Sequence, residues 1–160
     1  MNENSNPSIT FQFITTEIES KLKEYVQKQK NAEIFVACLG SIAGKKGNEI
    51  DFEIQRLLPF PNLSSTPELT VIPPENWTTI LDETTKLEEM RFLGFIHSHV
   101  DAVSKRSKAD TNYALVLSRE HGSILMGIVG KGLTLRMYHV SEGRFTLIDG
   151  KAEHFKIKTQ

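Results

Sequence analysis

The sequence lacks several features that would assign it to a specialised class. It contains a single cysteine, Cys38, among 160 residues, which excludes an intrachain disulfide and a zinc site built from three or four cysteines. Its 19 basic and 20 acidic residues nearly balance, so no field of one sign points to nucleic acid or to an anionic membrane surface. No run approaches the roughly 20 apolar residues of a membrane span, and the polar start, Met1 to Ser8, does not resemble a signal peptide. We therefore expect a cytoplasmic protein that binds neither nucleic acid nor membrane.

What the sequence does contain fits one globular domain. The chain is 39% hydrophobic and 24% charged, enough for a single core that buries roughly 68–70% of the unfolded surface. Its five histidines leave a metal site of histidines and carboxylates open. They are His97, His99, His121, His139 and His154.

Hydrophobic periodicity predicts an α/β or α+β fold, with a central mixed β-sheet flanked by helices. We expect helices near residues 17–31, 75–90 and 108–120, the first with a capping box at Thr16 and Glu19 and the third closed by Gly122. We expect strands at 34–43 and 48–58, which form a hairpin, then at 92–97, 123–129, 133–140 and 144–149. The domain is expected to span residues 10–150, between a disordered N-terminal tail (1–9) and a C-terminal tail (151–160).

Residues 59–74 form a long connection that holds five of the six prolines. Each proline removes a backbone donor and biases its predecessor toward extended geometry. A short strand could lie at Leu69 to Ile72. Long loops in compact domains are commonly either mobile or functional.

The residues that point to chemistry follow the apolar run at 92–96. His97 and His99 are two residues apart, so alternation along a strand places both imidazoles on the same side of the backbone. Asp110 comes eleven residues later, in the first turn of the expected third helix, from which a carboxylate can turn back toward the strand end. Two imidazoles and one carboxylate make three ligands, the number found in catalytic zinc sites, whose fourth position stays open.

A site of this kind also needs a base. Glu33 is the best candidate, because it begins the otherwise apolar run at 34–40, where a carboxylate is unexpected. A Ser-x-x-Asp pattern at Ser107 and Asp110 is also typical of a helix N-terminus, and the two interpretations are compatible.

These residues together resemble the signature of the JAMM (MPN+) metalloproteases. That signature has a Glu seven residues before a Gly on an early strand, then His-Ser-His, seven intervening residues and Ser-x-x-Asp. All five positions are present: Glu33, His97, His99, Ser107 and Asp110. The order of elements is similar over about residues 10–150. No insertion follows Asp110 like that of the chain-specific deubiquitinating members, so the chain resembles prokaryotic members or the catalytic core of the proteasome-lid deubiquitinase.

The resemblance implies a single MPN domain that binds one zinc ion through His97, His99 and Asp110. It implies hydrolysis by zinc-activated water of the peptide or isopeptide bond after the C-terminus of ubiquitin or a ubiquitin-like protein. Glu33 would then act as general base and proton donor, and Ser107 would hydrogen-bond the oxyanion. Conjugates of such proteins are the implied partners, together with an assembly of the proteasome type.

Two positions depart from the family pattern. Val100 stands where many members have Pro, and Val36 stands where Gly is often found. Neither position is a ligand, so both bear on loop shape and substrate fit. The 59–74 segment is our candidate for gripping the substrate tail by strand addition, with Leu69, Val71 and Ile72 as substrate-binding residues.

Two alternatives stay open. A non-catalytic MPN scaffold would only bind partners, although such relatives commonly lose the Glu or a ligand and this chain keeps all of them. A processing protease for a ubiquitin-fold sulfur-carrier protein would share the chemistry and differ only in substrate.

Other motifs carry less weight. Gly40 to Lys46 is one residue short of a phosphate loop and is interpreted as a hairpin turn. A zinc deaminase needs a Cys-x-x-Cys that one cysteine cannot supply. Cys38 lies on the strand face opposite Glu33 and is expected to be buried. Capping and core packing account for His121 and His139, and His154 is expected to be exposed.

Overall fold

The computed structural model describes residues 8–29, 32–45, 49–65, 72–99, 108–130 and 134–148, without the side chains of 45 and 108–110. This part of the chain forms seven strands and three helices. The strands are β1 (Ser8–Phe13), β2 (Phe35–Lys45), β3 (Glu49–Phe60), β4 (Arg91–Ser98), β5 (Ile124–Val129), β6 (Leu135–Ser141) and β7 (Arg144–Leu147). The helices are α1 (Thr16–Lys28), α2 (Trp77–Glu88) and α3 (Lys108–His121).

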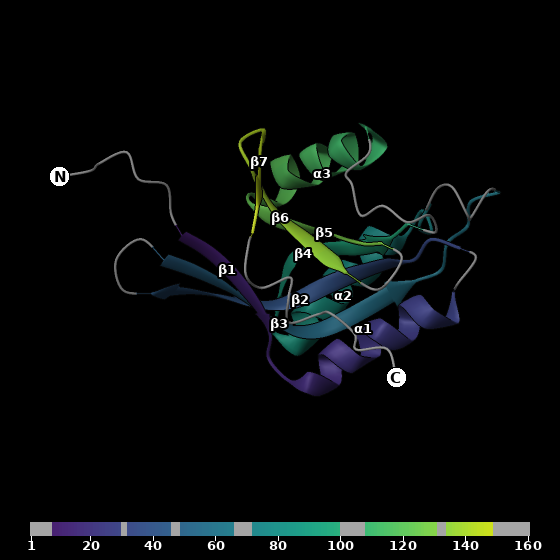
Figure 1. The fold of residues 1–160 in the computed structure, drawn as a ribbon, viewed down its shortest axis with the longest axis horizontal. Helices are drawn as coiled ribbons and strands as arrows, with labels where there is room; N and C mark the ends of the chain where they lie inside the picture. Colours follow the sequence, from purple (N-terminus) through teal and green to yellow (C-terminus); the bar gives the residue numbers. More distant parts are fainter. Residues whose placement is uncertain are drawn as a thin grey trace.

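All seven strands belong to one curled mixed sheet, in the order β1-β3-β2-β4-β5-β6-β7 (Figure 1). The β1–β3 and β4–β5 pairs are parallel, and the other neighbouring pairs are antiparallel. β4 is therefore a central strand with β2 on one side and β5 on the other. The predicted α+β class, a central mixed sheet flanked by helices, is confirmed.

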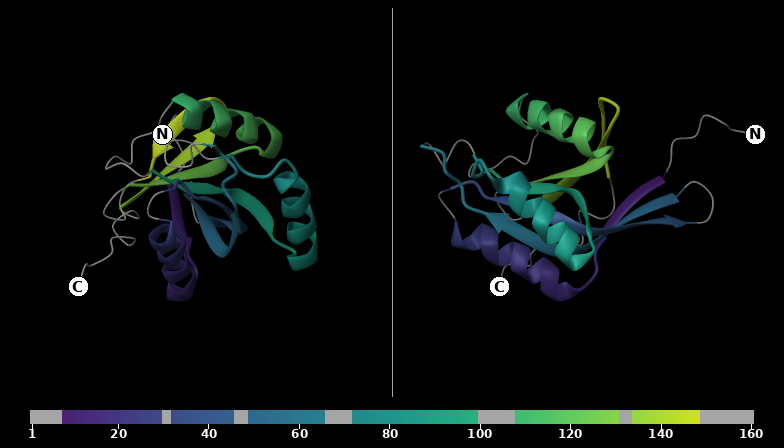
Figure 2. Two further views of the ribbon diagram at one scale, coloured as in Figure 1. Left: turned by 90° about the vertical axis from the view of Figure 1, so that its right-hand side faces the viewer. Right: turned by 180° about the vertical axis from the view of Figure 1, so that it is seen from behind.

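The helices cover both faces of the sheet, as the two views in Figure 2 show. Leu22 of α1 packs on one face with Val36, Cys38 and Ile96. α2 and α3 pack on the other face, where the buried side chains include those of Phe35, Trp77, Leu81, Phe95, Ala114 and Leu117. Alternation along β2 sends successive side chains into these two cores, so each strand that carries a candidate residue is held from both sides.

The aromatic side chains of the second core gather around Phe35, which is fully buried. Its ring centroid lies 5.2 Å from that of Trp77, 5.3 Å from that of Phe95 and 6.1 Å from that of Tyr113. Burial raises the pKa of the Tyr113 hydroxyl to about 12, despite an opposing hydrogen bond with Trp77. This aromatic cluster joins α2 and α3 to the sheet beneath the candidate site.

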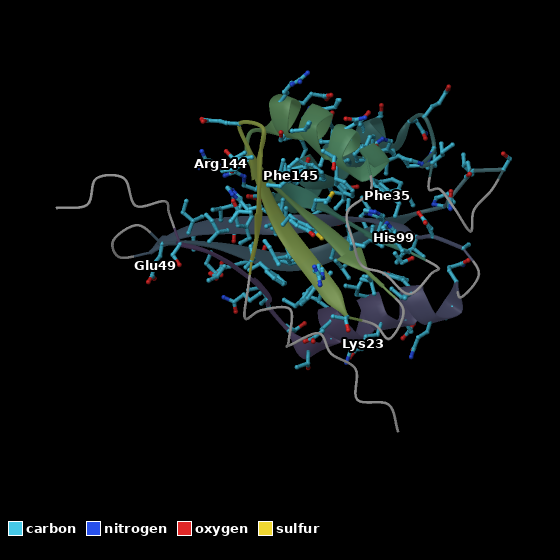
Figure 3. All side chains as sticks on the ribbon, turned by 45° about the horizontal axis from the view of Figure 1, so that its top comes forward. Lys23, Phe35, Glu49, His99, Arg144 and Phe145 are labelled. Atoms are coloured by element: carbon cyan, nitrogen blue, oxygen red, sulfur yellow. The ribbon has the colours of Figure 1, made fainter. Side chains whose placement is uncertain are left out.

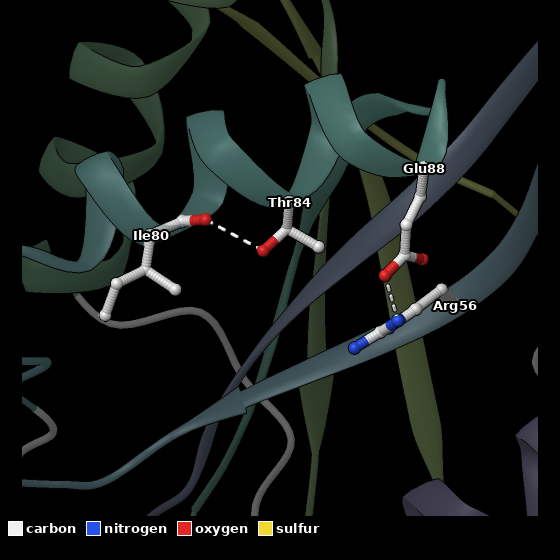
Figure 4. A network of polar contacts seen from close by, with 4 residues as sticks. All are labelled: Arg56, Ile80, Thr84 and Glu88. Carbon is white, nitrogen blue, oxygen red and sulfur yellow. Dashed lines mark hydrogen bonds and ion pairs between the residues drawn. The ribbon is translucent and has the colours of Figure 1, made fainter.

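The far end of α2 is fixed by an ion pair with the sheet. Glu88, in the last turn of the helix, accepts a hydrogen bond from the guanidinium of Arg56 on β3 (Figure 4). Within the helix, the Thr84 hydroxyl donates to the carbonyl of Ile80 at 2.8 Å. α2 is therefore anchored at both ends, by Trp77 in the aromatic cluster and by Glu88 at the sheet.

The predicted hairpin and the three predicted helices are confirmed with small shifts of boundary. β2 and β3 pair antiparallel, with an irregular register between Leu39 and Gly40, and Gly122 follows α3 with a positive φ of 83°. The N-cap of α1 is Thr15, whose side chain accepts from the Ile18 amide at 3.3 Å. The capping box expected at Thr16 and Glu19 was therefore wrong: Thr16 is the first residue of the helix, and Thr15 caps it alone.

β1 was not predicted, and its first residues, Ser8 and Ile9, fall in the segment assigned to the N-terminal tail. The strand pairs with β3 from Ser8↔Glu49 to Phe13↔Ile54. Its apolar residues Ile9, Phe11 and Phe13 pack on the α1 side of the sheet. On β3 the buried Asp51 accepts hydrogen bonds from the Thr10 hydroxyl and the Gln12 amide, both at 2.6 Å.

The sequence also led to expectations for Cys38, His121, His139 and His154. Cys38 is fully buried, and burial raises the pKa of its thiol above the usual range, so the expected inert core cysteine is confirmed. The His121 ring lies 4.7 Å from that of Phe92, and the His139 ring lies 5.8 Å from that of Phe52; burial lowers the pKa of His139. His154 lies outside the described residues.

None of the helices in the described segments is long and apolar enough to cross a membrane.

Candidate functional site

His97 and His99 lie at the end of the central strand β4. His97 is 1% exposed and its backbone is paired with Phe35 of β2 and Ile128 of β5. Its ring stacks on that of Phe95, with centroids 5.8 Å apart. His99 follows the strand, donates its backbone N–H to Val129 at 2.9 Å and is only partly buried. The imidazole of His97 therefore lies in the core, and that of His99, which is labelled in Figure 3, is partly exposed beyond the end of β4.

The two imidazole rings lie close together. Their centroids are 5.1 Å apart. A zinc–nitrogen bond of about 2.0–2.1 Å and a ring half-width of about 1.1 Å put each centroid roughly 3.2 Å from the ion, and a tetrahedral angle then separates the centroids by roughly 5.2 Å. The prediction that both rings share one side of the strand is confirmed, and zinc binding stays a prediction.

The start of α3 is directed toward these histidines by the packing of the helix along β4. His121 at the C-terminal end of α3 contacts Phe92, and Tyr113 contacts Phe95 with centroids 5.6 Å apart. The helix therefore runs back along β4, with its N-terminal turn at the end of the strand that carries His97. Residue 110 belongs to that turn, one turn before Tyr113.

Four predicted site residues have no described side chain. The side chain of Asp110 and the whole of Ser107 lie outside the described residues, as do Leu69 and Val71. Among the described side chains, no three His, Cys, Asp or Glu come together as a complete metal site. The third ligand and the oxyanion donor therefore stay predictions.

Glu33 comes just before β2, the strand that pairs with β4 and so lies next to the histidines' strand. Pairing of Phe35 with His97, and a hydrogen bond from the Ser98 amide to the Ile34 carbonyl (3.3 Å), set an antiparallel register. Regular pairing ends there, and if this register continued it would bring Glu33 opposite His99. Residues directly opposite in such a pair share one face and have Cβ atoms about 4.5–5.5 Å apart. Glu33 is 9% exposed.

Glu33 also lines a cleft of about 610 Å³ where the end of α1 meets the start of β2 and the end of β3. Apolar and polar groups both line it, including Tyr25, Lys28, Ile34, Phe60, Pro61 and Asn62. Glu33 therefore borders a cleft at the end of α1, and neither His97 nor His99 is among the residues that line it.

Sequence reasoning missed two residues that hold Glu33 in place. The Ser98 hydroxyl accepts from the buried Ile34 amide at 3.0 Å. The Asn62 side-chain amide donates to the Glu33 carbonyl at 2.9 Å. A small polar residue between two histidines in an apolar strand, and an Asn among prolines, were the only sequence signals for these roles.

Replacing Ser98 with Ala should cost about 1–3 kcal/mol of unfolding free energy, because the buried Ile34 N–H loses its acceptor. Urea denaturation measures the change. Ser118→Ala is the matched control: Ser118 is similarly buried, but its hydroxyl donates to Leu115 within the same helix. Equal losses in the two variants would show that Ser98 does not have this role.

Comparisons with known proteins support the fold alone. No protein-family model matches the chain, and no curated protein matches it. The solution structure of protein DSY2949 from Desulfitobacterium hafniense, a Northeast Structural Genomics Consortium target, is similar in fold, with a TM-score of 0.65. The two chains are 17% identical, and the match covers 87% of this chain and 88% of that one.

Proposed function

We propose that this protein is a zinc metallopeptidase of the JAMM type on a single MPN domain. Its substrate would be the peptide or isopeptide bond after the C-terminus of ubiquitin or a ubiquitin-like protein. The observation that carries the proposal is the pair of imidazoles of His97 and His99 at the end of β4, whose centroids are 5.1 Å apart. The five-residue sequence signature supports it independently.

In this proposal, His97, His99 and Asp110 hold the ion. When bound, zinc would polarise the scissile carbonyl and lower the pKa of a coordinated water to about 7. Neutral imidazole is the form that binds metal, and the burial of His97 in the aromatic core keeps its ring in place. The partly exposed His99 leaves one side of the site open to an incoming peptide.

Glu33 would take the proton of the attacking water and deliver it to the leaving amine. Its position next to Ile34, which is hydrogen-bonded to Ser98 between the two histidines, suits that role, since a general base must lie within reach of the reacting water. Ser107 would donate a hydrogen bond to the developing oxyanion, a contribution typically worth about 3 kcal/mol. The segment around Ile72, which is 53% exposed, would contact the extended tail of the substrate.

A cleavage assay tests this function. Fusions of ubiquitin and of a ubiquitin-fold sulfur-carrier protein are each incubated with the zinc-loaded protein, with the chelated protein and with the chelated protein after zinc is restored. We expect hydrolysis after the C-terminal residue of at least one fusion, loss with chelator and recovery with zinc. Cleavage that survives complete removal of metal would refute the proposal, as would no cleavage of either fusion by the zinc-loaded protein.

A further inference from the structure

One side chain, that of Asn62, joins three parts of the chain beside the candidate base. Its Nδ2 donates to the Glu33 carbonyl at 2.9 Å, just before β2. Its Oδ1 accepts from the backbone N–H groups of Ser64 at 3.0 Å and Ile72 at 2.9 Å. Asn62 therefore links three places: the residue before β2, the residues just after β3, and Ile72 near the end of the proline-rich segment.

Side-chain hydrogen bonds take the place of backbone pairing just before the start of β2. Regular pairing of β2 with its two neighbours begins at Phe35, two residues after Glu33. On the β4 side, the hydroxyl of Ser98 continues the pairing at Ile34; on the β3 side, the amide of Asn62 continues it at Glu33. The backbone that carries the candidate base is therefore held by side chains on both sides.

Asn62 also fixes two exposed apolar side chains. Leu63 is 60% exposed and Ile72 is 53% exposed. Their backbones are joined by a hydrogen bond from the Leu63 amide to the Ile72 carbonyl at 2.7 Å. Together with the Asn62 bond to the Ile72 amide, this bond joins the two ends of the proline-rich segment. The backbones of Leu63 and Ile72 are thus fixed beside Asn62, which lines the same cleft as Glu33.

We propose that Asn62 is a positioning residue that couples this segment to Glu33. The Nδ2 bond sets the backbone position of the base and therefore kcat, whereas the two Oδ1 bonds set the position of Leu63 and Ile72 and therefore KM. The inference rests on the proposed function. Displacement of a reacting group by about 1 Å can cost about 100-fold in rate, so a single hydrogen bond at this position has a measurable effect.

Two substitutions separate the two roles. Asn62→Asp keeps the acceptor oxygens for Ser64 and Ile72 but cannot donate to Glu33, so we expect kcat to fall about 10- to 100-fold with KM within about twofold. Asn62→Ala removes all three bonds, and we expect the same loss of kcat with KM raised at least about fivefold. Gln55→Glu, at an exposed amide on β3, the strand that ends just before Asn62, controls for the added negative charge and should leave both parameters within about twofold.

Amide hydrogen exchange gives a readout that does not depend on activity. The Ser64 and Ile72 amides should exchange at the wild-type rate in Asn62→Asp and at least about tenfold faster in Asn62→Ala. Asn62→Ala introduces no charge, so it serves as the second variant if the new carboxylate disturbs folding. If the wild type is active and both variants keep wild-type kcat, or if Asn62→Asp changes kcat and KM equally, the coupling is wrong. An inactive zinc-loaded wild type would instead refute the proposed function, and this inference with it.

Discussion

Glu33→Gln is expected to lose about 10²- to 10⁴-fold in kcat while the folded protein keeps its zinc. The amide has the shape of the carboxylate but cannot accept the proton of the attacking water. Glu33 is placed by its backbone, through Asn62 and through Ser98 at the neighbouring Ile34, so the substitution should leave the surrounding fold unchanged. Steady-state cleavage of the fusion substrate and metal analysis of the same sample measure both expectations.

Glu53→Gln is the matched control for this experiment. Glu53 lies on β3 and accepts a hydrogen bond from the Ser41 hydroxyl at 3.1 Å, away from the histidine pair. Its substitution also removes one carboxylate, so it has the same effect on net charge, and we expect kcat within about twofold of wild type. If Glu33→Gln cleaved as fast as Glu53→Gln, Glu33 would not be the base.

Gly94→Ala should have the largest effect on stability, a loss of at least about 4 kcal/mol. Gly94 has a φ of 148°, which side chains rarely adopt, and a Cβ there would meet the Leu125 carbonyl oxygen at 1.9 Å. Gly94 begins the parallel pairing of β4 with β5, the pairing that continues to His97. The backbone of β4 or β5 must therefore shift in Gly94→Ala, and the histidine pair at the end of β4 shifts with it. Denaturant unfolding and metal content measure the two consequences.

Gly44→Ala separates this clash from the general cost of replacing a glycine. Gly44 lies in β2, and a Cβ at this position meets nothing within 4 Å. We expect its unfolding free energy to stay within about 1 kcal/mol of wild type. A Gly94→Ala protein as stable as Gly44→Ala, with full metal content, would show that the β4–β5 contact is looser than described.

Local patterns predicted most of the fold, because its helices and the hairpin are encoded over short distances. β1 was missed for a physical reason: it is a short strand whose partner, β3, begins about forty residues later. Ile9, Phe11 and Phe13 alternate with polar residues, but the sequence does not show that β3 offers a free edge beside them. The exact cap of α1 was also missed, since Thr15 and Thr16 are equivalent in composition.

In the candidate site, too, local features were predicted and features that depend on distant residues were not. The shared face of His97 and His99 follows from alternation within one strand, and the structure confirms it. The register between β2 and β4, which brings the backbone next to Glu33 to the end of β4, is not specified by any local pattern. The Ser98–Ile34 and Asn62–Glu33 bonds join residues 64 and 29 positions apart, so only the folded chain reveals them.

Elemental analysis of the purified protein tests the central claim most directly. After loosely bound metal is removed by gel filtration, we expect about one zinc ion per chain, and His99→Ala should lose it because only two protein ligands remain. His121→Ala, which removes a histidine packed against Phe92, should keep it. A wild-type protein that holds no zinc after loading, or a His99→Ala protein that holds as much as wild type, would contradict the account.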